Sequence, residues 1–142
     1  MTVEFTIPGK PVGKGRPRFR RAGTYVQTYT PKATAGYERT VRDCWKASRQ
    51  EPLNGEIEAI IYAYFPIPKS ATKRRRALME SGAIGCGTKP DADNIAKAVL
   101  DALNGLAYTD DSKVTRLVVV KLYGTEPRVE IRLTEMLSEV QK

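Results

Sequence analysis

The sequence contains no histidine, and this absence excludes several common kinds of catalytic site. A Ser-His-Asp triad, a Cys-His protease pair, a zinc site with imidazole ligands and a nuclease with a histidine base all require that side chain. Catalysis by this chain must therefore use carboxylates, lysines, tyrosines or a metal ion that oxygen ligands hold.

Cysteine is also scarce, because Cys44 and Cys86 are the only two in the chain. Two cysteines cannot build a four-cysteine zinc site or a disulfide-rich scaffold, so we expect two reduced thiols in a cytoplasmic protein, with a single disulfide as the alternative. No run of about 18 apolar residues occurs, so no membrane span is expected. Residues 1–7 alternate like a β-strand and do not resemble a signal peptide.

Acidic residues are outnumbered by basic ones, at 16 against 24, which gives a net charge of +8 and a pI near 9.6. A surplus of this sign favours a polyanionic partner such as nucleic acid or an acidic membrane face. The 142 residues, of which 41% are hydrophobic, suit a single globular domain over residues 1–142.

The spacing of hydrophobic residues predicts both strands and helices. The strand near residue 60 is apolar on both faces, as is typical of an interior strand. The order of the elements predicts an α/β fold, more narrowly α+β, in which helices pack on a mixed β-sheet. We expect strands at 2–7, 56–65, 115–123 and 128–134, and helices at 31–50, 71–80 and 92–104.

The connections between these elements carry signals of their own. Residues 124–127 contain Gly and Pro between two short strands, which predicts a hairpin. Ser70 stands before the short helix at 71–80 and is predicted to cap it. Residues 9–32 are rich in Gly, Pro and basic residues and are predicted to form a basic loop or an irregular hairpin, while the glycines of residues 81–88 predict a mobile loop.

Two pairs of aspartates are the informative acidic residues. Asp91 and Asp93 fall in the first turn of the helix at 92–104, where helix capping and the helix dipole are the plainer explanation. Asp110 and Asp111 lie in a turn, where solvated aspartates are common. If that turn folds back toward the helix, the carboxylates repel one another unless a cation joins them. Oxygen ligands without histidine or thiolate select Mg²⁺ or Mn²⁺ over zinc.

Basic residues gather in the segment 9–32 and in the short helix at 71–80. Their charges suit DNA phosphates, and the plainer interpretation is a solvated surface. Phe19, Tyr25 and Tyr29 suit either stacking on unpaired bases or packing in the core. The residues expected to contact a nucleic acid are Lys14, Arg16, Arg18, Arg20, Arg21, Lys73, Arg74, Arg75, Arg76 and Lys89.

One ordered set of short motifs resembles the RusA family of Holliday-junction resolvases. The resemblance is tight over residues 89–114 and extends loosely over most of the chain through the order of elements and the Gly-Arg-Pro-Arg of residues 15–18. It implies a RusA-like single domain. The motifs are Lys89-Pro-Asp-Ala-Asp-Asn94, Lys97, Asp101-Ala-Leu-Asn-Gly105 and Asp110-Asp111 with Val114.

The resemblance also implies a function. It implies a homodimeric, Mg²⁺-dependent endodeoxyribonuclease, with Mn²⁺ as a substitute, that resolves four-way DNA junctions by paired symmetric nicks in recombination and repair. Matched by position, the metal-binding and catalytic carboxylates would be Asp91, Asp93 and Asp111, and Lys97 would be the functional lysine. Such a protein is cytoplasmic, comes from a bacterium or a phage, and has no membrane partner.

Three assignments stay open in the sequence. Some members of the family carry arginines directly before the first aspartate pair, whereas here residues 89–90 are Lys-Pro, so the basic groups beside the scissile phosphate are undetermined. Lys97 is equally explained, on spacing alone, by an i,i+4 ion pair with Asp93. The sequence does not decide between Asp110 and Asp111 as the nearer metal ligand.

Two rival functions share most of these residues. One is a Mg²⁺-dependent nuclease that acts on other branched DNA, and the other is a non-catalytic DNA-binding module in which the acids only cap helices and turns. A dimer surface is not visible in the sequence; residues 117–120 and one face of the helix at 31–50 are the candidates.

Overall fold

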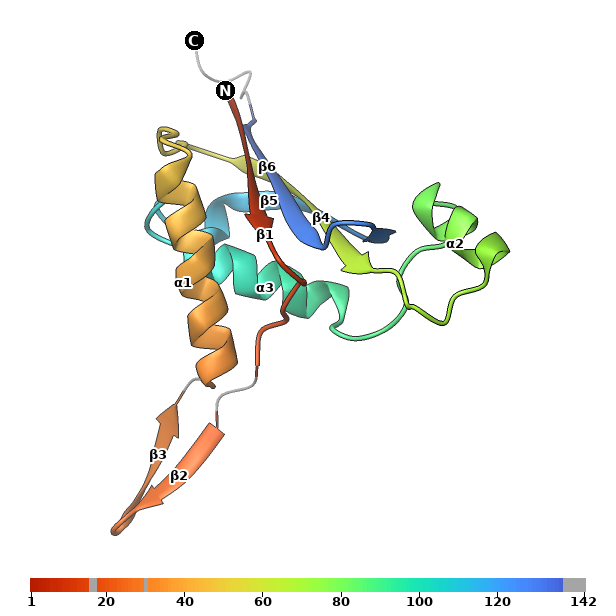
Figure 1. Cartoon of the computed structure of the whole chain (residues 1–142). Coiled ribbons are helices and arrows are strands. Elements are labelled where there is room, and N and C mark those ends of the chain that lie inside the picture. Colours follow the sequence, from red (N-terminus) through yellow and green to blue (C-terminus); the bar gives the residue numbers. More distant parts are fainter. Residues whose placement is uncertain (16–17, 30, 137–142) are drawn as a thin grey trace.

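The computed structural model describes residues 1–15, 18–29 and 31–136 and shows a four-stranded sheet with two long helices on one side (Figure 1). The predicted α+β class with a mixed sheet is confirmed. In chain order the elements are β1 (Thr2–Pro8), β2 (Arg18–Ala22), β3 (Tyr25–Tyr29), α1 (Lys32–Ala47), β4 (Ile57–Pro66), α2 (Lys73–Glu80), α3 (Ala92–Leu103), the 3-10 turn η1 (Asp111–Lys113), β5 (Val114–Gly124) and β6 (Arg128–Glu135).

The main sheet has the strand order β1-β6-β4-β5. β4 pairs in parallel with β5 and antiparallel with β6, while β1 pairs antiparallel with the other side of β6. Side chains along β4 alternate between buried and half-buried, because the strand is apolar on both faces and has a neighbour at each edge. The predicted interior position of this strand is confirmed.

The hairpin predicted at residues 124–127 is wrong, because β5 and β6 are not neighbours in the sheet. β4 lies between them and hydrogen-bonds to both. Residues 124–127 therefore pass over the end of β4 instead of closing a two-strand turn. The apolar β4 decides this arrangement, since a strand between two others buries both faces and satisfies the backbone groups at both edges.

The cap predicted for α2 is also wrong in its position. The hydroxyl of Thr72, rather than that of Ser70, accepts a hydrogen bond from the backbone N–H of Arg75 at 3.2 Å. Ser70 lies in a preceding turn, which the hydrogen bond from the N–H of Ala71 to the carbonyl of Pro68 closes at 3.1 Å. Threonine is a somewhat weaker cap than serine, so the turn at residues 68–71, and not capping preference, decides which of them starts the helix.

The core lies between one face of the sheet and the helices α1 and α3 (Figure 1). Alternate residues of β1, β4 and β6 are buried in it. Tyr37, Val41 and Trp45 form the buried stripe of α1, and the ring of Trp45 meets Phe5 of β1 edge-on with centroids 5.6 Å apart. The prediction that Trp45 is a core residue is confirmed.

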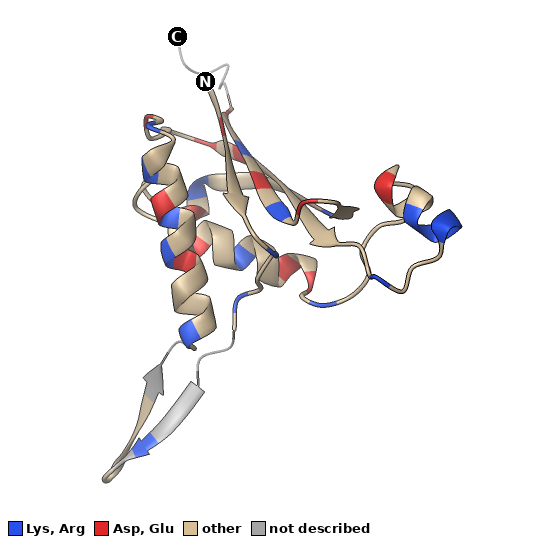
Figure 2. Cartoon of the chain, viewed as in Figure 1, with Lys and Arg blue, Asp and Glu red and all other residues tan. Residues whose placement is uncertain are grey.

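Two basic elements stand away from this body (Figures 1 and 2). β2 and β3 pair into an antiparallel hairpin, which confirms the hairpin alternative for residues 9–32. Tyr25, at its tip, is 63% exposed and so does not pack in the core. α2 projects beyond the end of β4.

Two expectations drawn from composition concern the cysteines and the helices. Cys44 and Cys86 are both free thiols. Within the described residues, none of the helices combines the length and the apolar character that crossing a membrane requires.

Candidate active site

α3 presents a polar stripe on the side opposite the core. Ile95 and Val99 are fully buried against the sheet, whereas Asp93 and Lys97 are exposed and Asp101 is half-buried. The stripe follows from the helical period, which places residues three and four apart on one face. The predicted division of this helix into an apolar and a polar side is confirmed.

Asp91 occupies the N-cap position of α3 with an extended backbone conformation, but its side chain makes no capping hydrogen bond. Its carbonyl accepts the first helical hydrogen bond, from Ile95 at 3.1 Å. Capping therefore does not account for the exposed carboxylate of Asp91, and that group is open to another role.

One pocket joins the two acidic stretches. It has a volume of about 260 Å³, and Asp93, Lys97 and Asp101 of α3 line it together with Asp111 of η1. Leu117 of β5 also lines the pocket. Carboxylates that lie far apart in the sequence thus share one hollow, because the chain leaves α3 through a tight turn and comes back along β5.

Asp110 and Asp111, at the start of η1, have different surroundings. The carboxylate of Asp110 accepts a hydrogen bond from the N–H of Ser112 at 3.1 Å and so caps the 3-10 turn. This hydrogen bond holds the pKa of Asp110 below its usual value. Asp111 makes no such cap and lines the pocket. Of the two aspartates, Asp111 is the one that lines the pocket with Asp93.

Tyr108 ties the returning turn to α3. Its hydroxyl donates to the carbonyl of Leu100 at 2.7 Å, and the ring is 2% exposed. Burial is the largest cause that raises the pKa of Tyr108, and the negative charges of Asp111, Asp101 and Asp110 raise it further. Tyr108 therefore stays a neutral hydrogen-bond donor beside acidic residues. Sequence reasoning missed it, although it lies inside the motif segment.

A half-buried ion-pair network lies behind the polar stripe. The ammonium of Lys14 contacts Glu38 Oε2 at 2.5 Å and Asp101 Oδ2 at 3.2 Å, and Lys97 contacts Asp101 at 3.6 Å. Burial, the largest cause, lowers the pKa of Lys14, yet the two carboxylates together raise it above the ordinary value. The ion pair considered for Lys97 thus forms with Asp101 and not with Asp93.

Lys14 and Glu38 form an ion pair beside the polar stripe of α3 that the sequence did not predict. Lys14 was expected to contact DNA, but only 19% of its side chain is exposed and two carboxylates hold its ammonium. Glu38 lies on α1, and only the packing of α1 beside α3 brings it here. No local signal in the sequence marks Glu38 as part of this network.

Asp91 lines a neighbouring pocket of about 460 Å³, together with Lys10, Lys89 and Asn94. Within residues 1–15, 18–29 and 31–136, no three Asp, Glu or Cys side chains are close enough together to hold a metal ion. The available donors are nevertheless carboxylate oxygens, which suit Mg²⁺ or Mn²⁺ in their chemistry. The structure thus brings Asp93 and Asp111 to one pocket and leaves Asp91 beside it.

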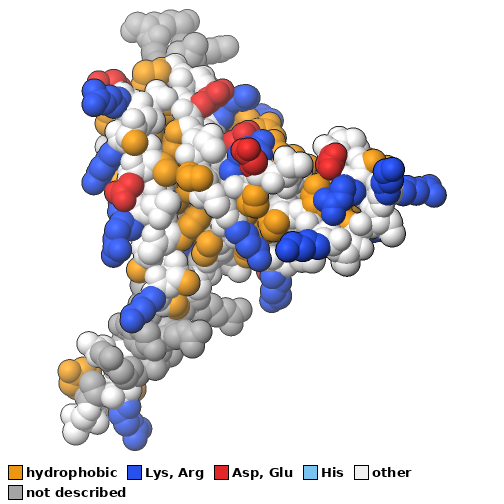
Figure 3. All heavy atoms as spheres, in the orientation of Figure 1, with side chains coloured by type: hydrophobic (Ala, Val, Ile, Leu, Met, Phe, Trp, Pro, Cys, Tyr) orange, Lys and Arg blue, Asp and Glu red, His pale blue; other side chains and the backbone are white. Residues whose placement is uncertain are grey.

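The basic residues expected to bind DNA lie mainly on the two projecting elements. Arg16 lies outside the described residues, and β2 holds Arg18, Arg20 and the exposed Arg21. Lys73, Arg74 and Arg75 of α2 are exposed, as is Lys89, and Figure 3 shows basic side chains gathered over α2. Arg76 is less available to DNA than the other three, because its guanidinium donates a hydrogen bond to the carbonyl of Pro68 at 3.3 Å.

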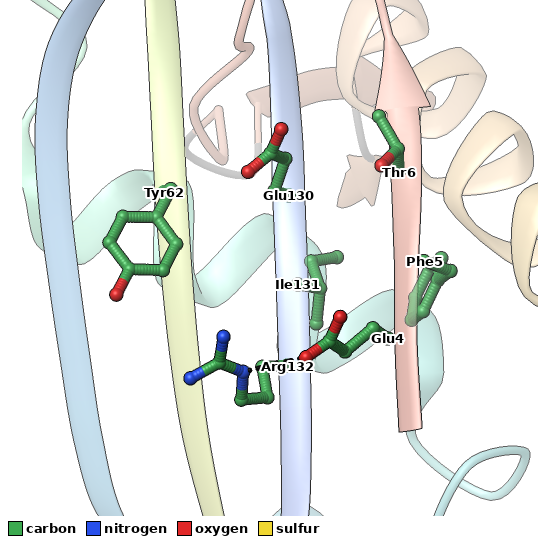
Figure 4. Close-up of a pocket in the computed structure, with 7 residues that line it drawn as sticks. All are labelled: Glu4, Phe5, Thr6, Tyr62, Glu130, Ile131 and Arg132. Atoms are coloured by element: carbon green, nitrogen blue, oxygen red, sulfur yellow. Dashed lines mark hydrogen bonds and ion pairs between the residues drawn. The ribbon is translucent and has the colours of Figure 1, made fainter. Parts of the chain in front are cut away.

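A further pocket, of about 380 Å³, lies on the face of the sheet that no described helix covers (Figure 4). Glu4 and Arg132 line it and pair at 2.9 Å, and Glu130 beside them holds Arg128 at 2.8 Å. Because arginines already neutralise these carboxylates, this pocket does not suit a divalent cation.

We expect Lys14→Met to lower the free energy of unfolding by about 2 kcal/mol, because it leaves the half-buried Glu38 without a cation and leaves Asp101 with only the longer contact to Lys97. The raised pKa of Lys14 means that this stabilisation is fully present below the ordinary pKa of 10.5 and is lost as the pH rises through the higher folded-state pKa. Urea denaturation at pH 7 measures the effect against Lys46→Met, an exposed control. Equal stability of the two variants would contradict the role of the network.

Two comparisons with known proteins place the chain in a family. Residues 8–134 match the family model described as Endodeoxyribonuclease RusA. The chain is also 37% identical over 137 residues to the Uncharacterized protein YqaN of Bacillus subtilis (strain 168), an alignment that covers 94% of this chain and 96% of that protein. A match over nearly the whole chain, together with this relative, shows that the chain belongs to the RusA endodeoxyribonuclease family.

Proposed function

We propose that this protein is a Mg²⁺-dependent crossover junction endodeoxyribonuclease that resolves four-way DNA junctions by paired symmetric nicks in recombination and repair. The observation that carries the proposal is that Asp93 and Asp111, from separate segments, line one pocket with Lys97. Membership of the RusA family and the net charge of +8 support branched DNA as the substrate.

Asp93 and Asp111, which share one pocket, are the proposed ligands of Mg²⁺, for which Mn²⁺ would substitute. Asp91, at the neighbouring pocket, is the proposed third ligand, and we propose that it closes on the ion only when the ion and DNA bind. The ion, when bound, lowers the pKa of a coordinated water and offsets charge on the scissile phosphate. Asp101 is a poorer ligand, because Lys14 and Lys97 contact its carboxylate at 3.2 and 3.6 Å and offset its charge. Within this pocket, Asp93 and Asp111 are therefore the better ligands for the cation.

Lys97 is proposed to stabilise the negative charge that develops on the phosphate or on the leaving oxygen. Its side chain is 62% exposed, so its ammonium can leave Asp101 and reach a substrate at the pocket. We expect Lys97→Ala to reduce the nicking rate at saturating junction by about a hundredfold, as is usual for loss of one stabilising donor.

Single-turnover rates and separate binding titrations distinguish this effect from a loss of affinity. Lys46→Ala removes an equal charge from the exposed surface of α1 and serves as the control. An unchanged single-turnover rate for Lys97→Ala would return Lys97 to the role of an ordinary ion-pair partner of Asp101.

A homodimer is part of the proposal, because two symmetric nicks need two active sites related by a two-fold axis. The uncovered face of the sheet is the surface that fits. Its three arginines each pair with a glutamate, so the face is electrically neutral and is a poor match for DNA. Its middle is apolar, with Ile60, Tyr62, Val118 and Val120 half-buried there.

This surface keeps Val118 and Val120 of the candidate at residues 117–120 and leaves out Leu117 and the face of α1. α1 uses its apolar stripe in the core, and Leu117 lies at the carboxylate pocket. Light scattering is expected to give twice the chain mass of 15.8 kDa. We expect Val118→Glu to give the mass of one chain and the control Thr115→Glu, on the same strand, to leave the dimer intact. A dimer that survives Val118→Glu would place the interface elsewhere.

The deciding experiment is incubation of the protein with a synthetic four-way junction, with and without Mg²⁺, followed by mapping of nicks on opposing strands. The proposal predicts paired nicks at symmetric positions, only in the presence of the ion. A replication fork and a linear duplex of the same sequence serve as competing substrates. Preferred cleavage of the fork would favour the nuclease on other branched DNA, and binding of the junction without any Mg²⁺-dependent nick would favour a non-catalytic DNA-binding module.

A further inference from the structure

The pocket of about 460 Å³ beside Asp91 has features that the proposed chemistry does not use. It lies between the segment that follows β1 and the start of α3. Lysines and apolar surface line it together, from Lys10, Pro11 and Val12 on one side and from Lys89 and Pro90 on the other. Its volume falls in the range usual for sites that bind small ligands.

The wall that residues 10–14 form is held against α3 by a hydrogen bond and a close backbone approach. The backbone N–H of Lys14 donates to the carbonyl of Asn94 at 2.9 Å. Gly13 approaches α3 so closely that a Cβ on it would lie 2.6 Å from the Cβ of Pro90. Closely packed backbone therefore forms this side of the pocket.

Two ammonium groups at the pocket are free to bind an anion. Lys10 and Lys89 are exposed, and neither makes a hydrogen bond or ion pair to another residue in the part of the chain that the structure describes. Lys14 differs, because Glu38 and Asp101 already hold its ammonium. A phosphodiester group suits the two free lysines.

The apolar surface indicates that the ligand is more than a phosphate. Pro11, Val12 and Pro90 contribute hydrocarbon surface to the pocket. An unstacked nucleobase covers such surface favourably, and proteins that act on DNA hold unpaired bases between apolar side chains in this way. At the branch point of a DNA junction, the bases are easier to unstack than within a continuous duplex.

We propose that this pocket binds one unstacked nucleotide of the DNA strand, with its base against the apolar wall and its phosphate between Lys10 and Lys89. The assignment rests on the proposed nuclease function, since it places the nucleotide next to the carboxylates. It adds a part of the site that holds an unpaired base, which the carboxylate pocket itself does not provide.

The test is a titration of the full-length, ¹⁵N-labelled protein with the single-stranded trinucleotide pTpTpT, followed by amide NMR without divalent ions. We expect saturable shift changes at the amides of Gly13, Lys89 and Asn94. A trinucleotide with an abasic middle residue should bind about tenfold more weakly, because base stacking is lost.

Charge variants complete the test. We expect the double variant Lys10→Gln/Lys89→Gln to bind the trinucleotide about tenfold more weakly, since two phosphate contacts are lost. The double variant Arg39→Gln/Lys46→Gln loses the same charge from exposed positions on α1 and should change the affinity by less than about twofold.

Two results would overturn the assignment: equal affinity for the intact and the abasic trinucleotide, or shift changes confined to β4 or α2. The titration needs neither metal nor cleavage, so its failure differs from a failure of the proposed function. If the protein nicks junctions but shows no such amide changes, only the nucleotide pocket is contradicted. If it shows the amide changes but does not nick junctions, only the proposed nuclease activity is contradicted.

Discussion

Asp93→Asn and Asp111→Asn are each expected to reduce Mg²⁺-dependent nicking of a four-way junction by about a thousandfold, since loss of an ion ligand removes several kcal/mol of transition-state stabilisation. Both side chains line the same pocket, although the two residues stand on different elements. Junction binding should persist or tighten, because each change removes a negative charge that repels phosphate.

Asp91→Asn tests the third proposed ligand. Asp91 lies in the neighbouring pocket and makes no capping hydrogen bond, so its replacement should leave the stability of α3 nearly unchanged. A loss of nicking as large as that of Asp93→Asn would therefore report on catalysis and not on folding.

Single-turnover nicking over a range of Mg²⁺ concentrations measures these effects, and a gel-shift titration with Ca²⁺ measures binding. Asp43→Asn, at an exposed position on α1, is the matched control. Metal-dependent nicking that persists in the variants of Asp91, Asp93 and Asp111 would remove all three residues from the catalytic assignment.

The second large effect concerns the projecting α2. Simultaneous replacement of Lys73, Arg74 and Arg75 by glutamine is expected to weaken junction binding and to reduce the slope of log affinity against log salt concentration by up to about three, one for each lost phosphate contact. Arg76 is left in place, because its guanidinium also hydrogen-bonds to the carbonyl of Pro68.

Fluorescence anisotropy at several salt concentrations provides both quantities. The triple control Arg39→Gln/Lys46→Gln/Arg49→Gln removes the same charge from exposed residues of the body. The hairpin set Arg18→Gln/Arg20→Gln/Arg21→Gln is compared in the same way. If the α2 set and the control gave the same affinity and slope, α2 would be a solvated helix without a role in binding.

The elements themselves were largely predictable, because each depends on a local period. Val41 and Trp45 of α1, and Ile95 and Val99 of α3, repeat at helical spacing, and the structure buries all four. The arrangement of the strands was not predictable in the same way. β5 and β6 look like a hairpin over residues 124–127, yet β4 separates them, since strand order depends on contacts between residues that are distant in sequence.

The sequence alone determined the chemistry that is available: aspartates in two separate stretches, no histidine, and an excess of positive charge. Tertiary structure alone decided that Asp111 and not Asp110 enters the pocket, that Glu38 holds Lys14, and that Lys97 pairs with Asp101. The physical reason is that residue types follow from the chain, whereas the few ångströms that separate two charges follow from how helices and strands pack.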